Sequence, residues 1–324
     1  MNNEIIPEVE THKHLGMHFT NNLTWHNHIE HIRTKAWKRI NVMKRLKYTL
    51  DRSSLETIYI SFIRPILEYG DIIFCNCTNY EKLELDRIQN EAARIVTGAT
   101  KLVSLVNLDK EIGWESLHTR RKKHKLILFY KMVYGLSPPY LQELIPENVG
   151  CISNHNLRNA NHFRNIHSKS SSFTNSFLPS VIRDWNSLPL ETRNCSSLSI
   201  FKRLLNSDSP VIPRHYYYGD RHLQIQHARL RTKCVPLNSF LFCKDLVMIP
   251  NCKCGSLENI EHYFLTCPLY SQERHILFTK LSFLSSITVD ILIYGDDTLS
   301  LATNINIVDA VHGFIKSTKR FSMK

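Results

Sequence analysis

Three cysteines and one histidine near the C-terminal end have the spacing of a metal site. The segment reads Cys252-Lys-Cys254-Gly-Ser-Leu-Glu-Asn-Ile-Glu-His262-Tyr-Phe-Leu-Thr-Cys267. Three thiolates and one imidazole complete the tetrahedral shell that Zn²⁺ prefers in structural sites, with no position left for a substrate. We therefore predict a structural zinc ion, whose binding stabilises the fold, at Cys252, Cys254, His262 and Cys267. His275 is the substitute ligand if His262 points elsewhere, and metal-free buried cysteines are the competing interpretation.

A second motif, Tyr294-Gly-Asp-Asp297, has the sequence of the catalytic turn of several template-dependent polymerases. Such carboxylates hold two metal ions, and this requires a further carboxylate on a neighbouring strand. Here the cysteine cluster precedes the turn and 27 residues follow it. We therefore predict an ordinary turn between a strand and a helix, and no catalytic residue or catalytic cofactor in the chain. Residual primer extension by Asp296 and Asp297 is an alternative that we do not expect.

The third chemical feature is positive charge. The sequence has 41 lysines and arginines but 29 acidic residues, which gives a net charge of +12. An excess of this size attracts polyanions through counterion release. Two predicted helices concentrate it, and we predict that they contact the backbone of RNA or DNA without reading sequence. A solvated basic surface is the competing interpretation. The predicted contacts are Arg33, Lys35, Lys38, Arg39, Lys44, Arg45 and Lys47 on the first helix, and Arg120, Arg121, Lys122, Lys123 and Lys125 on the second.

Composition places these motifs in an ordinary globular chain. Apolar residues make up 43% and charged residues 22% of 324 residues, which is enough for two compact units. The first ten residues do not resemble a targeting segment, and no apolar run approaches the length of a membrane span. Six of the nine cysteines are scattered, which favours a reducing compartment. We expect an intracellular protein of the cytoplasm, the nucleus or both, with no membrane partner.

Hydrophobic periodicity predicts the elements that position the motifs. A strand is expected from Lys13 to Phe19, followed by a turn at Asn21-Asn22. Helices are expected from Thr24 onward, from a capping box at Ser53-Ser-Leu-Glu56, over 81–96, over 114–134 and around 198–205. Few strand signals follow residue 20.

The predicted fold class is mainly α, in four successive parts. Residues 1–25 form a strand and turn, and residues 26–150 form a helical bundle. An irregular linker follows over 151–214 and contains Trp185-Asn-Ser-Leu-Pro189, where composition shifts toward Asn, Ser and His. A small α/β domain occupies 215–324 and is held by the metal element at 252–267.

Several segments resemble the reverse transcriptases of jockey-like non-LTR retrotransposons, in the order of that family. Lys13-His-Leu-Gly16, followed by Leu23-Thr-Trp25, resembles the stretch directly after the polymerase active site. Arg64-Pro-Ile-Leu-Glu-Tyr-Gly70 looks like part of the helices that follow, and Asp184-Trp-Asn-Ser-Leu-Pro189 like the connecting region. The cysteine–histidine segment resembles the family's terminal zinc-knuckle-like element.

The resemblance implies a function and a place within a larger enzyme. The family protein is an RNA-directed DNA polymerase, whose catalytic aspartates would lie before residue 1 of this chain. Residues 1–25 would then be the primer-grip-like end of a polymerase palm, and residues 26–150 a thumb. We expect a C-terminal fragment that lacks the catalytic palm and is inactive alone, but binds a template–primer or RNA. A complete retrotransposon reverse transcriptase is a further expected partner. The alternative is a zinc-containing protein-interaction module without a nucleic-acid partner.

Overall fold

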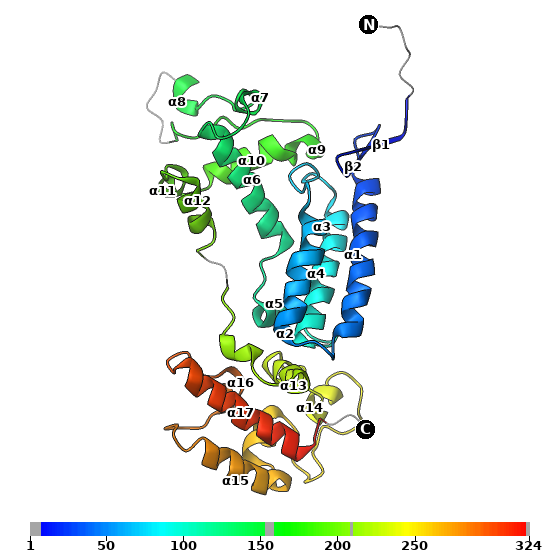
Figure 1. Ribbon diagram of the computed structural model, residues 1–324, viewed down its shortest axis with the longest axis vertical. Coiled ribbons are helices and arrows are strands. Elements are labelled where there is room, and N and C mark those ends of the chain that lie inside the picture. The colour runs from blue at the N-terminus through cyan, green and yellow to red at the C-terminus, as the bar shows by residue number, and fades with distance from the viewer. Residues whose placement is uncertain (1–7, 153–158, 208–209, 322–324) are drawn as a thin grey trace. The chain divides into compact units, whose positions relative to one another are not determined.

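The computed structural model describes residues 8–152, 159–207 and 210–321, and it confirms a mainly helical chain. Contacts group the chain into two units that each combine several stretches of sequence (Figure 1). Unit 1 comprises residues 1–38, 63–89 and 114–210, and unit 2 comprises 39–62, 90–113 and 211–324. This grouping differs from the successive parts expected from sequence, because two long helices, α1 (His26–Leu46) and α4 (Asn79–Thr97), begin in unit 1 and continue into unit 2.

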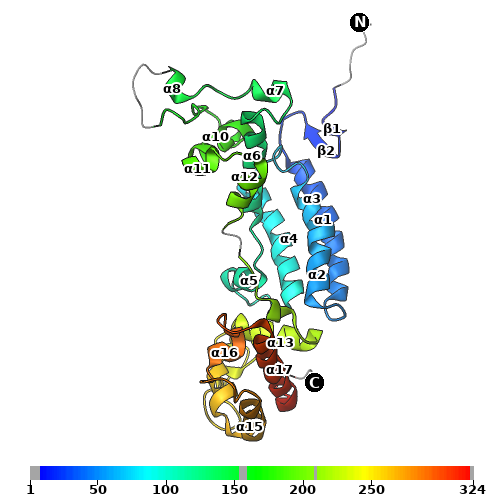
Figure 2. The same cartoon turned by 60° about the vertical axis from the view of Figure 1, so that its left-hand side comes forward.

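Unit 1 packs around the second basic helix, α6. The elements that lie entirely within this unit are β1 (Thr11–His14), β2 (Met17–Thr20), α3 (Arg64–Glu68), α6 (Leu117–Val133), α7 (Pro139–Gln142), α8 (Val149–Ile152), α9 (Ser171–Thr174), α10 (Phe177–Asn186), α11 (Leu190–Arg193) and α12 (Leu198–Leu205). The apolar side of α6 lies against α10 and α12 (Figure 2). Phe129, Tyr130, Val181, Trp185 and Phe201 are buried together in this core.

Helix α12 confirms the helix predicted around 198–205, whereas α9 to α11 lie where an irregular linker was expected. Trp185, within that expected linker, is 3% exposed and packs edge-on against Phe129. Each of the helices between residues 171 and 205 is too short to be stable in isolation. Burial of apolar side chains on α6 therefore supplies the stability that local periodicity does not reveal.

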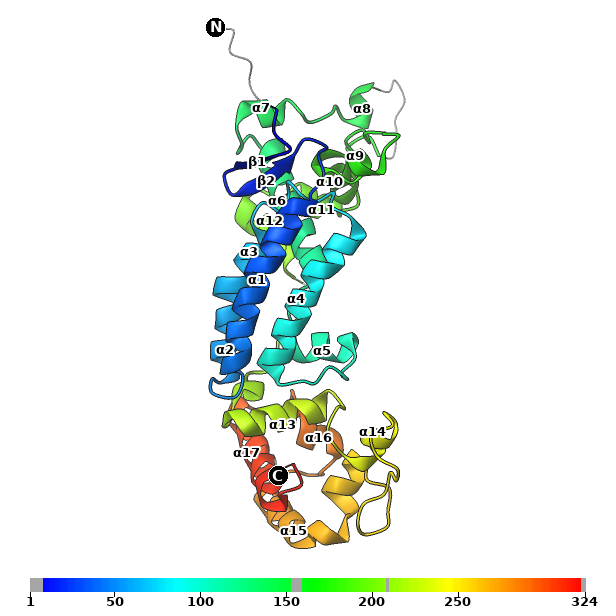
Figure 3. The same ribbon diagram turned by 90° about the vertical axis from the view of Figure 1, so that its right-hand side faces the viewer.

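The strand predicted over Lys13–Phe19 is a two-stranded antiparallel hairpin. Leu15 and Gly16 both have positive φ angles, of 46° and 82°, and form its turn. Two-residue hairpin turns require this left-handed backbone, and glycine adopts it without strain. Lys13 pairs with His18 across the ladder, and the hairpin lies at the N-terminal end of α1 (Figure 3).

Unit 2 is built around the long C-terminal helix α17 (Leu301–Thr318). Its other elements are α2 (Arg52–Ile58), η1 (Tyr59–Ile63), α5 (Leu105–Ile112), η2 (Arg214–Tyr217), α13 (Arg221–Arg231), α14 (Asn238–Phe242), η3 (His262–Thr266), η4 (Pro268–Tyr270), α15 (Ser271–Lys280) and α16 (Val289–Tyr294). Helix α17 packs against α13, α15 and α16 (Figure 3). Tyr263, Phe264, Leu292 and Phe314 form part of a common apolar core.

No strand occurs between residues 210 and 321, so the α/β character predicted for this domain is wrong. The segment before the Gly-Asp-Asp turn, rich in β-branched residues, forms helix α16. Thr288 caps that helix by accepting a hydrogen bond from the backbone N–H of Ile291. Leu292 and Ile293 then bury themselves against α17, and no neighbouring strand is present to pair with.

Helix boundaries differ from prediction where a cap was misassigned. Asp51, not Ser53, caps α2 by accepting from the N–H of Ser54. Pro65 is the second residue of α3, which follows the π-helical turn η1, and proline is tolerated in a first helical turn. The helix α5 was not predicted. No helix in the described ranges combines the length and the apolarity that crossing a bilayer would require.

Candidate metal centre and basic surfaces

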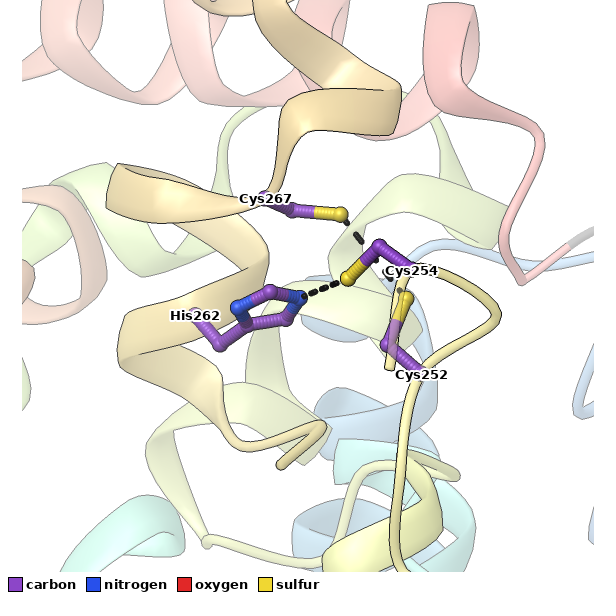
Figure 4. Close-up of side chains that lie close together, drawn as sticks. All are labelled: Cys252, Cys254, His262 and Cys267. Carbon is purple, nitrogen blue, oxygen red and sulfur yellow. Dashed lines mark hydrogen bonds between the residues drawn. The ribbon is translucent and has the colours of Figure 1, made fainter. Parts of the chain in front are cut away.

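The structure brings the four predicted metal ligands together in unit 2. The ligand atoms of Cys252, Cys254, His262 and Cys267 all lie within 4.8 Å of one another (Figure 4). The Sγ atoms of Cys252 and Cys267 are 3.8 Å apart, and the Sγ of Cys254 is 3.2 Å from Nε2 of His262. Two thiolates at about 2.3 Å from a tetrahedral zinc ion would be about 3.8 Å apart. The group could therefore hold a metal ion, and its dimensions suit zinc.

The imidazole of His262 is oriented from its far side. Its Nδ1 lies 3.2 Å from the hydroxyl of Thr266, which leaves Nε2 facing Cys254. The backbone N–H of His262 donates to Oδ1 of Asn259 at 2.7 Å. Metal-binding histidines are commonly fixed by a hydrogen bond at the nitrogen that does not bind the metal. The alternative ligand, His275, is not a member of the converging group.

A tight turn presents Cys252 and Cys254 from the same side. The N–H of Cys252 donates to the carbonyl of Ser256, and the N–H of Gly255 donates back to the carbonyl of Cys252. Gly255 has a φ of +96°, a conformation that other residues rarely adopt. Cys267 follows the π-helical turn η3, and its carbonyl accepts from Arg274.

The protein environment shifts the pKa values of Cys254 and Cys267 in opposite directions. A hydrogen bond from the backbone N–H of Ser256 lowers the pKa of Cys254, which favours its thiolate. Burial raises the pKa of Cys267 to about 11. A metal ion binds thiolate and would supply the positive charge that a buried Cys267 thiolate requires.

An ion pair fixes the loop between Cys254 and His262. Glu258 is 3% exposed, and its carboxylate accepts two hydrogen bonds of 2.7 Å from Arg320 and one from the N–H of Asn238. Sequence reasoning missed this pair, because 62 residues separate its members and no local pattern marks them.

The Gly-Asp-Asp turn is held by hydrogen bonds of its own. The carboxylate of Asp296 accepts from the N–H and the hydroxyl of Thr298, which lowers its pKa. The side chain of Asn304, 4% exposed, bonds both the N–H and the carbonyl of Asp296 at 2.8 Å. Among the residues that the structure describes, the three cysteines and His262 are the single group of metal-binding side chains that converges. This geometry favours an ordinary turn, which follows helix α16 and not the strand predicted from sequence.

Helix α1 carries the more open of the two predicted basic surfaces. Lys35, Lys38 and Arg45 are exposed, and none has a carboxylate within ion-pair distance in the described ranges. The remaining predicted contacts on this helix are engaged in other ways. Arg33 pairs with Glu30 and Glu84, Lys44 pairs with Glu91, Arg39 donates to the carbonyl of Phe62, and burial lowers the pKa of Lys47 to about 8.

Helix α6 directs its cations toward acidic residues of unit 1. Arg120 pairs with Glu68, Lys123 with Glu115, and both Lys122 and Lys125 with Asp184. Arg121 is 7% exposed and is therefore buried. Sequence reasoning missed these partners, since they lie on distant segments. The geometry gives the basic run of α6 a role inside the unit and leaves α1 as the stronger candidate surface.

Comparison with known proteins gives one distant relationship. A probable RNA-directed DNA polymerase from the transposon X-element of Drosophila melanogaster is 27% identical over 124 residues. The matched stretch covers 37% of this chain and 13% of that protein, so the chain spans a small part of its relative. This similarity supports a relation to retrotransposon reverse transcriptases. No family model and no solved structure matches the chain.

Proposed function

We propose that this chain is the nucleic-acid-holding, C-terminal part of a retrotransposon RNA-directed DNA polymerase. Its helices would hold a template–primer or RNA, and a structural zinc ion would hold its terminal domain together. The observation that carries the proposal is the similarity to the transposon polymerase, joined to a metal-binding group at the position where the family resemblance implies one.

The exposed side of α1 supports nucleic-acid binding. Lys35, Lys38 and Arg45 follow one another at three and seven residues, so they lie along one side of the helix. Cations without carboxylate partners are free to replace the counterions of a phosphate backbone. Such contacts position a duplex without reading its bases. A complete retrotransposon reverse transcriptase, which would supply the catalytic palm, is the proposed protein partner.

A filter-binding titration tests the nucleic-acid proposal. Affinity for an RNA–DNA duplex should fall roughly tenfold or more over a few-fold rise in salt concentration. The double variant Lys35→Glu, Lys38→Glu should bind more weakly and lower the salt slope by about one for each phosphate that it no longer binds. Lys316→Glu, which reverses an exposed charge elsewhere, is the matched control. Salt-independent binding, or equal binding by both variants, would refute the proposal.

The competing class, a zinc-containing interaction module without nucleic acid, predicts a different result. Partners recovered with the full chain would then survive nuclease treatment, whereas partners bridged by nucleic acid would be lost. Supporting evidence for the present proposal is therefore a nuclease-sensitive set of partners together with direct, salt-sensitive binding of purified protein.

A further inference from the structure

An apolar groove in unit 2 lies beside the metal-binding element and serves no role in the proposed function. Its volume is about 740 Å³, and it is lined by residues of α13, α14 and α16 and by residues around η3. Its lining is mainly aliphatic and includes Leu237, Ile260, Leu265 and Ile293. Sites that bind ligands commonly have this size and this apolar character.

A smaller basic pocket continues the groove at one end. Lys233 and Tyr294 line both cavities, so the two share a wall. The second cavity has a volume of about 310 Å³, and Lys110 and Arg231 also line it. Arg231 is paired with Glu111, whereas neither Lys110 nor Lys233 has an ion-pair partner within the described ranges. The continuous surface thus combines an aliphatic trough with two uncompensated ammonium groups.

The backbone at Lys233 indicates that its side chain matters. This residue follows the C-terminus of α13 with a φ of +54°, and its N–H donates to the carbonyl of Leu230. Glycine is the residue that normally occupies this left-handed position after a helix, because it has no Cβ. The left-handed backbone disfavours a lysine at this position, and we therefore infer that the Lys233 side chain serves a function that offsets the conformational cost.

Charge decides which class of macromolecule fits the groove. Two carboxylates, Glu261 and Asp290, line its apolar part and would repel a phosphate backbone. A protein segment whose apolar side chains fill the groove, with acidic side chains facing Lys110 and Lys233 and basic side chains facing Glu261 and Asp290, satisfies both the lining and the charges.

We propose that this groove binds an amphipathic peptide segment of a partner protein that carries both acidic and basic side chains beside its apolar ones. The proposal does not depend on nucleic-acid binding by α1, since the two surfaces use different residues.

Selection from a random peptide display library on the full-length, zinc-loaded chain tests this inference. Recovered peptides should carry apolar side chains at helical spacing, together with both acidic and basic residues. Their affinity for Phe240→Ala, which removes a ring that lines the groove, should fall on the order of tenfold. Phe283→Ala, an exposed phenylalanine outside the groove, is the matched control and should bind normally.

Lys233→Gly separates binding from folding. Glycine suits the left-handed backbone, so the melting temperature should stay the same or rise, while affinity for acidic peptides falls. Failure to recover peptides, or recovery of peptides that bind both groove variants as well as the wild type, overturns the proposal. Displacement of the peptides by oligouridylate at low salt also overturns it, because the groove would then belong to nucleic acid.

Discussion

Replacing Glu111 by glutamine should destabilise unit 2 more than any other single change of comparable size. Its carboxylate accepts from Arg52 and, through two hydrogen bonds of 2.8 Å, from Arg231. The three side chains are 2–3% exposed and join α2, α5 and α13. Burial alone would raise the pKa of Glu111, but the charges of Arg231 and Arg52 outweigh it and lower that pKa.

The magnitude follows from what the substitution leaves behind. Glutamine keeps the shape but removes the charge, so two buried guanidinium groups lose their counterion. Breaking a buried pair in this way costs about 3–5 kcal/mol. Natural domains have a total unfolding free energy of roughly 5–15 kcal/mol, so the change should be obvious. Glu143→Gln, at an exposed position, should cost less than about 0.5 kcal/mol.

Urea unfolding followed by far-ultraviolet circular dichroism measures this effect. Circular dichroism is the more direct measurement for unit 2, because Trp25, Trp37, Trp114 and Trp185 all belong to unit 1. The triple variant Arg52→Met, Glu111→Leu, Arg231→Met removes the charges together and should be more stable than Glu111→Gln. A loss below about 1 kcal/mol for Glu111→Gln, or a triple variant less stable than the single one, would refute the reasoning.

Three further outcomes follow from the structure. Purified protein should contain about one zinc ion per chain by elemental analysis, and Cys254→Ser should abolish it while Cys243→Ser, an exposed free thiol, should not. Burial and the neighbouring His18 and His31 lower the pKa of His28 to about 4. The contribution of neutral His28 to the unfolding free energy should therefore be fully present above pH 6.5 and should fall by roughly 3 kcal/mol as the pH approaches 4. An unfolding free energy of the wild type that does not change with pH relative to His28→Gln would argue against this. Asn304→Ala should cost about 2 kcal/mol by releasing the Gly-Asp-Asp turn, and primer extension assays in magnesium or manganese should show no product for wild type or Asp296→Asn.

Local sequence was sufficient where a short segment contains its own determinants. The four metal ligands lie within 16 residues, so their types and spacing specified the group before any packing was known. Hydrophobic periodicity likewise predicted a helix from Thr24 onward, and Ile29, Ile32, Ala36 and Ile40 on one side of α1 are buried. In both cases the physical cause, ligand chemistry or helical repeat, acts over a few residues.

Tertiary structure decided everything that depends on partners distant in sequence. The cations of α6 have the composition of a nucleic-acid surface, but Glu68, Glu115 and Asp184 pair with them across 8 to 62 residues. The segment 171–193 was expected to be irregular, yet it contains the helix α10, whose Val181 and Trp185 are buried with Phe129 and Tyr130 of α6. The peptide groove arises only where α13, α14 and α16 meet the metal-binding element. The sequence by itself determined which side chains could bind metal or phosphate. Only the three-dimensional packing determined which of the charged side chains remain exposed to solvent, because burial and ion pairing depend on neighbours that no local pattern specifies.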